Sequence, residues 1–126
     1  MGYRSHPIER TMSEARSLRD LQAMVDAFAQ ERNWERFHSP KNLAVSAAIE
    51  AAELMEHFQW TSAGDCVTAD EKKAIGEEMS DVLAYLLRLA SVLEIDLVDA
   101  FQAKIAKNAI KYPAPQQAER GTVGDR

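Results

Sequence analysis

The stretch from Ala69 to Leu93, "ADEKKAIGEEMSDVLAYLLRLASVL", decides the fold class. Its apolar residues recur every three or four positions, which is the period of an α-helix that buries one face. Thr68 precedes the stretch and Glu71 follows three residues later, so the pair predicts a capping box at the helix start. The expected apolar stripe consists of Ile75, Met79, Val82, Leu83, Leu86, Ala90 and Leu93.

Three shorter segments show similar start signals and apolar spacing. The expected helices cover residues 18–34, 40–59 and 97–111. Ser17, Ser39 and Asp96 stand at their starts, where a side-chain oxygen can cap free backbone amides. Strand-like alternation is absent from the sequence. The sequence therefore predicts an all-α fold, namely a four-helix bundle.

The length of 126 residues fits a single domain. We expect a flexible N-terminal tail over residues 1–16, a helical domain over 17–113 and a disordered C-terminal tail over 114–126. A chain this short leaves apolar helix faces that a second subunit can bury, so a homo-oligomer is expected.

Charge and composition exclude several function classes. The net charge is -5, from 15 basic and 20 acidic residues, which argues against binding to long nucleic acid. No apolar run approaches the ~20 residues of a membrane span, so no membrane partner is expected. Cys66 is the single cysteine and suits a reducing compartment, so we expect a cytoplasmic protein.

Two acidic pairs occupy matching places on neighbouring helices. Glu50 and Glu53 form E-x-x-E, and Glu78 and Asp81 form E-x-x-D. The first acid of each pair borders the apolar stripe, and the second lies roughly 60° further round the helix. Helices that pack stripe to stripe would bring the two pairs together. Four converging carboxylates predict a hard divalent cation, Mg²⁺ or Mn²⁺.

Two other interpretations of these acids stay open at this point. Acidic residues at helical spacing usually form a solvated face, although the matched positions on two helices argue against that here. Di-iron bundles instead use Glu-x-x-His motifs. His57 follows Glu53 by four residues rather than three, so an iron site is not expected.

A cationic edge and several aromatic side chains indicate a phosphorylated ligand with a flat ring. Phosphate groups would find donors along one edge of the fourth helix, at Lys104, Asn108 and Lys111, unless these form a solvated ridge. The candidates for stacking on a base are Trp34, His38, Trp60 and Tyr85. Together with the acids, these groups suggest a nucleotide that carries a polyphosphate.

Two stretches, "EAAELMEHFQW" at residues 50–60 and "EEMSDVLAYLLRLA" at residues 77–90, resemble the MazG-like all-α nucleoside triphosphate pyrophosphohydrolases. The stretches "ERNWERFHSPKNL" and "KIAKNAIKYP" are similar to the dCTP pyrophosphatase branch of that family and stand in the same order. The resemblance covers roughly residues 18–113.

The resemblance implies Mg²⁺-dependent hydrolysis of a deoxynucleoside triphosphate to the monophosphate and pyrophosphate, in nucleotide-pool house-cleaning. Residues 17–113 would be the catalytic domain of a dimer or of a tetramer built from dimers. By this resemblance Glu50, Glu53, Glu78 and Asp81 bind metal. Lys104 and Asn108 would contact phosphate and sugar, and Trp34, His38, Trp60 and Tyr85 would hold the base. We expect Glu53 or Glu50 to orient or deprotonate the attacking water.

The base and even the activity stay open at the level of sequence. Some close relatives carry a pocket histidine where this chain has Val25, so dCTP, dUTP, dATP and modified nucleotides are all candidates. The alternative is a non-catalytic nucleotide-binding or interaction module on the same helical scaffold.

Overall fold

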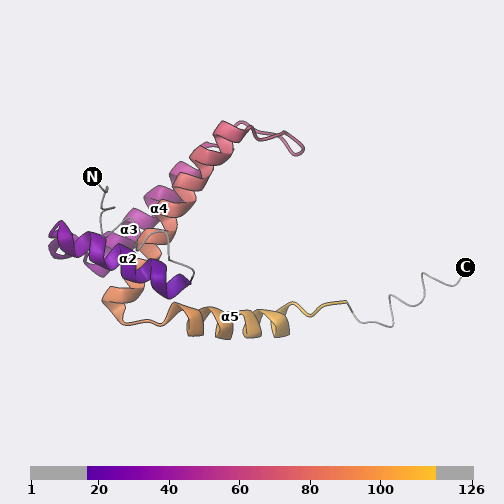
Figure 1. The fold of residues 1–126 in the computed structure, drawn as a ribbon. Helices are drawn as coiled ribbons and strands as arrows, with labels where there is room; N and C mark the ends of the chain where they lie inside the picture. The colour runs from indigo at the N-terminus through magenta and orange to yellow at the C-terminus, as the bar shows by residue number, and fades with distance from the viewer. Residues whose placement is uncertain (1–16, 116–126) are drawn as a thin grey trace, which may run out of the picture. The chain divides into compact units, whose positions relative to one another are not determined.

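The computed structural model describes residues 17–115. These residues form four α-helices and one 3₁₀-helix, without a strand, so the predicted all-α class is confirmed (Figure 1). The elements are α2 (Leu18–Glu31), η1 (Trp34–Phe37), α3 (Pro40–Glu56), α4 (Ala69–Leu93) and α5 (Leu97–Lys111). The predicted N-terminal tail and residues 116–126 of the C-terminal tail lie outside the described residues.

The predicted caps explain where the helices begin. At the start of α4, the Thr68 hydroxyl accepts from the Glu71 amide at 3.2 Å, and the Glu71 carboxylate accepts from the Thr68 amide at 2.7 Å. Ser39 accepts from the Asn42 amide at 3.1 Å in front of Pro40, whose missing N–H needs no partner at that position. All four α-helices begin where the sequence predicts.

Two helices end earlier than predicted. Asn33 adopts a left-handed conformation with φ of 54°, which ends α2 at Glu31 and starts the tighter turn of η1. The second helix stops at Glu56 rather than residue 59, because the amides that follow donate to carbonyls three residues back instead of four. Helix ends depend on such local turns, which apolar periodicity does not encode.

The chain divides into two compact units between Ile95 and Asp96. In the first unit α3 runs beside α4, and α2 packs against α4 (Figure 1). The second unit contains α5. No helix within the described part of the chain has the length and apolarity needed to cross a bilayer.

The buried core is smaller than the predicted stripes. Leu43 on α3 and Leu87 on α4 are the largest fully buried side chains. Met79 and Leu86, expected in the core, are 57% and 44% exposed. The apolar stripe on α4 is wider than the surface that α2 and α3 cover. The exposed apolar residues of α3 and α4 include Val45, Ile49, Met79, Leu83 and Leu86.

Candidate functional site

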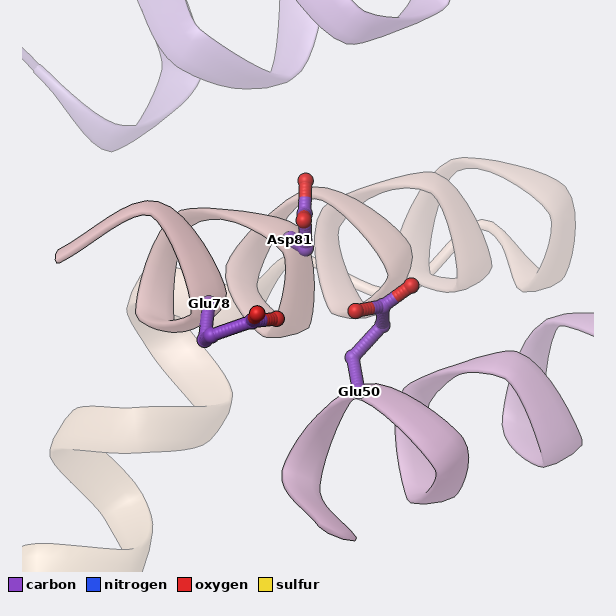
Figure 2. Close-up of side chains that lie close together, drawn as sticks. All are labelled: Glu50, Glu78 and Asp81. Carbon is purple, nitrogen blue, oxygen red and sulfur yellow. The ribbon is translucent and has the colours of Figure 1, made fainter. Parts of the chain in front are cut away.

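Three of the four predicted metal ligands meet between α3 and α4. Glu50 projects from α3 toward Glu78 and Asp81 on α4 (Figure 2). One carboxylate oxygen from each residue lies within 4.8 Å of the others. Glu78 and Asp81 share a helix face because they are three residues apart. We call Glu50, Glu78 and Asp81 the acidic cluster.

The acidic cluster contains polar atoms that nothing else in the described chain satisfies. One carboxylate oxygen each of Glu50 and Glu78, Oε2, is buried and lacks a hydrogen-bond partner among residues 17–115. Burying such an atom unpaired destabilises the fold. A cation would satisfy both atoms, and oxygen donors of this kind are the ligands that Mg²⁺ and Mn²⁺ prefer. The residues therefore fit a hard divalent ion.

The electrostatics of the cluster centre on Glu50. Desolvation, then hydrogen bonding and charge from Glu53, then the charges of Asp81 and Glu78, raise the pKa of Glu50 to about 7. At neutral pH this carboxyl group therefore takes up a proton readily. Because a bound cation favours the ionised form, metal binding would displace that proton.

Glu53 lies outside the acidic cluster and acts on it through Glu50. His57 was missed as a neighbour of the cluster: its Nε2 atom is 3.9 Å from Oε1 of Glu78. This neighbour could be predicted from the sequence. His57 follows Glu50 by seven residues, which is about two helical turns and places the two side chains on the same face.

The MazG-like family model matches residues 45–124, more than half of the chain. The chain belongs to the MazG-like family. The family membership predicted from the sequence stretches at residues 50–60 and 77–90 is thereby confirmed.

Curated relatives of this MazG-like chain include dCTP pyrophosphatase 1 from Homo sapiens, 40% identical over 102 residues, and the same-named protein from Bos taurus, 36% identical over 107 residues. The alignments cover 78% and 82% of this chain. The chain spans only about 60% of the length of these relatives, with 60% of the human and 63% of the bovine protein matched.

A solved structure supports the fold. A crystal structure of a pyrophosphatase from Archaeoglobus fulgidus is 37% identical to this MazG-like chain and superposes with a TM-score of 0.63. The match covers 90% of this chain and 99% of the archaeal chain. The helical architecture is therefore that of a MazG-like pyrophosphatase.

Of the four predicted base-binding residues, Tyr85 lies on α4 and the other three lie at the two ends of α3. Trp34 and His38 precede this helix, whereas Trp60 follows it and is 89% exposed. Since the 17 residues of α3 extend over roughly 25 Å, one chain does not gather all the predicted base contacts. Trp34 packs edge-on against Phe28, with ring centroids 5.5 Å apart.

His38 belongs to a polar network that the sequence did not reveal. Arg88, only 8% exposed, donates through Nε to Nδ1 of His38 at 2.9 Å and through a terminal nitrogen to Asp26 at 2.8 Å. The other carboxylate oxygen of Asp26 accepts from Ser91 at 2.7 Å, and Gln22 donates to Ser91 at 2.8 Å. We call these five residues the Arg88 network.

Glu35 also approaches the Arg88 network, 3.9 Å from the guanidinium. Glu35 and His38 have the Glu-x-x-His spacing of di-iron bundles that His57 lacks. Both side chains face Arg88, whose cation makes this an unsuitable place for iron.

The predicted phosphate contacts lie in the second unit, on α5. Lys104 and Lys111 are exposed, and Asn108 is half-buried. These residues recur at intervals of four and three along α5, so they share one face. Their roles in binding phosphate and sugar stay predictions.

Proposed function

We propose that the protein is a nucleoside triphosphate pyrophosphohydrolase that converts a deoxynucleoside triphosphate to the monophosphate and pyrophosphate. The observation that carries the proposal is the acidic cluster with its buried, unpartnered oxygens. Membership of the MazG-like family and the named activity of the curated relatives support the same reaction class.

The acidic side chains have distinct roles in this proposal. Glu50, Glu78 and Asp81 would hold Mg²⁺, which supplies Lewis-acid charge neutralisation when bound. Glu53 stands outside the cluster and so stays available to orient the attacking water and accept its proton, with Glu50 as the other candidate base. Water oxygen bonds to the α-phosphorus, and the bond to the bridging oxygen of the pyrophosphate breaks. Lys104, Asn108 and Lys111 would stabilise the charge of the phosphates.

The proposed substrate is dCTP or a related or modified nucleotide. Trp34, His38 and Tyr85 would contact the base. Trp60 lies at the far end of α3, so it reaches this pocket only from a second copy of the chain. We therefore propose a homo-oligomer, either a dimer or a tetramer built from dimers, in which each base pocket uses two chains.

A nucleotide panel tests the activity. The purified protein, with Mg²⁺, is assayed against dCTP, 5-methyl-dCTP, dUTP and dATP, and pyrophosphate and inorganic phosphate are measured separately. We expect pyrophosphate and monophosphate. Release of inorganic phosphate and a diphosphate would overturn the proposed bond position, and Mg²⁺-dependent binding without turnover would indicate the non-catalytic module.

Matched variants test the acidic cluster. Glu78→Gln removes one ligand charge and is expected to lower kcat about 100-fold or more, because charge stabilisation by a correctly held ion is lost. Glu77→Gln is the control, since this neighbouring side chain is exposed and lies outside the cluster. Equal loss in both variants would contradict the assignment.

A further inference from the structure

The Arg88 network has a fixed hydrogen-bond direction. The guanidinium of arginine carries a hydrogen on every nitrogen and cannot accept. Because Arg88 Nε donates to His38 Nδ1, that ring nitrogen must present its lone pair. The proton of the neutral imidazole is then on Nε2. The Arg88 network therefore selects one tautomer of His38.

The rest of the Arg88 network holds the guanidinium in place. Asp26 accepts from Arg88 with one oxygen and from Ser91 with the other. The Ser91 hydroxyl donates its one hydrogen bond to Asp26, so its oxygen acts as the acceptor for the Gln22 amide. Within this series, Nε and one terminal nitrogen of Arg88, the Ser91 hydroxyl and the Gln22 amide each donate to an acceptor. Nε2 of His38 forms no hydrogen bond with any of the described residues.

The network shares a face of α4 with part of the acidic cluster. Asp81, Tyr85 and Arg88 are separated by four and then three residues, so their side chains leave α4 on the same side. Seven residues correspond to a rise of ~10.5 Å. A nucleotide whose phosphates lie at the acidic cluster would therefore extend its base toward Tyr85 and His38.

We propose that Arg88 is a positioning residue that fixes His38 as an Nε2–H donor to an acceptor on the nucleobase, either a carbonyl oxygen or a ring nitrogen. This inference rests on the proposed function for the identity of the ligand. Burial and the charge of Arg88 also lower the pKa of His38, against an opposing contribution from Glu35. The imidazole is therefore held neutral, as a donor through one nitrogen alone.

Nitrogen-15 NMR tests the tautomer without any nucleotide. Long-range ¹H–¹⁵N correlation spectra of the full chain at pH 7.5 distinguish a protonated ring nitrogen from an unprotonated one. The signals of His38 are assigned by their loss in His38→Asn. We expect Nδ1 unprotonated and Nε2 protonated in the wild type. A proton on Nδ1 in the wild type would overturn the proposal.

Variants of Arg88 test the cause of the tautomer. Arg88→Met removes the donor, and Arg88→Lys keeps a cation for Asp26 but lacks the Nε–H that faces His38. Both are expected to show a mixture of tautomers. An unchanged Nε2–H tautomer in a folded variant would contradict the role of Arg88. The wild-type spectrum decides the question if Arg88→Met does not fold.

Kinetics then connect the tautomer to binding. With dCTP and Mg²⁺, we expect Arg88→Lys to raise KM about ten-fold, the effect of one hydrogen bond, and to change kcat less than about two-fold. Leu87→Val is the control, because it disturbs the buried packing of the same helix turn and should leave KM unchanged. An unchanged KM in Arg88→Lys, or an equal rise in Leu87→Val, would overturn the proposal.

The two measurements separate this inference from the proposed function. Absence of turnover in the wild type, together with the expected NMR tautomer, would reject the enzymatic proposal and leave the tautomer selection intact. Turnover with the opposite tautomer would reject only the role of Arg88.

Discussion

Glu50 couples proton binding to metal binding at the scale of a single residue. Its raised pKa, about 7, arises first from desolvation and then from the acids around it. Below pH 7 a cation must displace a proton from this carboxyl group. We expect the apparent affinity for Mg²⁺ to fall about ten-fold per pH unit below 7 and to level off above about pH 8.

Titration calorimetry with Mg²⁺ at pH 6, 7 and 8 checks this dependence. Glu50→Gln is the comparison, because the amide cannot release a proton and should remove most of the slope. Equal wild-type affinity at pH 6 and pH 8 would exclude Glu50 as the titrating ligand.

The same shift predicts how stability depends on pH in metal-free buffer. The pKa of Glu50 is raised on folding from an ordinary value of 4.5. A raised pKa means that the contribution is present in full below about pH 4.5 and is lost as pH rises through about 7. We expect Glu50→Gln to raise the Tm in EDTA at pH 8 and to change it little at pH 5, as thermal unfolding would show.

Added Mg²⁺ gives the complementary result for stability. It should raise the Tm of the wild type at pH 8 by satisfying the buried oxygens, and it should do so much less for Glu50→Gln. A variant that gained no stability in EDTA at pH 8 would indicate that the carboxylates do not repel one another in the folded chain.

Residues of the site differed in how well sequence could locate them. Glu50, Glu78 and Asp81 were predictable because helical spacing fixes their angular positions. Arg88 was not, because a buried arginine looks like any solvated cation until its partners are known. Asp26 and His38 stand 62 and 50 residues away from it in sequence.

At the scale of elements, the capping box of α4 is a testable local determinant. The Thr68 hydroxyl accepts from the Glu71 amide, and the Thr68 amide donates to the Glu71 carboxylate. We expect Thr68→Ala to lower the free energy of unfolding by about 1 kcal/mol, measured by urea denaturation. Thr68→Ser keeps the hydroxyl and is the matched control. A loss of the same size in both variants would show that the methyl group, rather than the cap, stabilises this end.

Helix starts were predictable and helix ends were not, for a physical reason. A start needs a specific side-chain oxygen, which the sequence displays at Ser17, Ser39, Thr68 and Asp96. The end of α2 instead depends on the left-handed backbone of Asn33, and α4 ends similarly at Glu94, with φ of 54°. Neither residue is the glycine that usually marks such an end.

At the scale of the whole molecule, the exposed apolar residues of α3 and α4 predict self-association. Val45 and Ile49 are 48% and 54% exposed and lie one helical turn apart. We expect Val45→Glu to weaken association about 100-fold or more, because a charge would be buried unpaired in the interface. Sedimentation velocity across a concentration series would measure it.

Lys41→Gln is the charge-matched control for that experiment, since it also lowers the net charge by one and Lys41 is exposed one turn earlier on α3. A wild type that stays monomeric at all concentrations would contradict the proposed oligomer. Loss of association in both variants would instead point to net charge rather than to the apolar contact.

Sequence periodicity gave the apolar faces of the helices but not what covers them. Leu43 and Leu87 are buried within the chain, while Met79 and Leu86 have the same spacing and are not. Periodicity shows only that a helix has an apolar face. It does not show whether another helix of the same chain or a partner chain buries that face.

Asp81 and Arg88 lie on one unbroken helix, so the number of residues between them fixes the relative orientation of their side chains. This limits how the sequence of α4 can change in evolution. A single residue inserted between them would rotate one side chain by ~100° about the helix axis relative to the other, so the two would no longer share a face. The loop at residues 61–67, between Trp60 and the Thr68 cap, carries no such constraint, because none of these groups lies in it. We expect related sequences to differ in length in that loop and to keep the same length between Asp81 and Arg88, over residues 82–87.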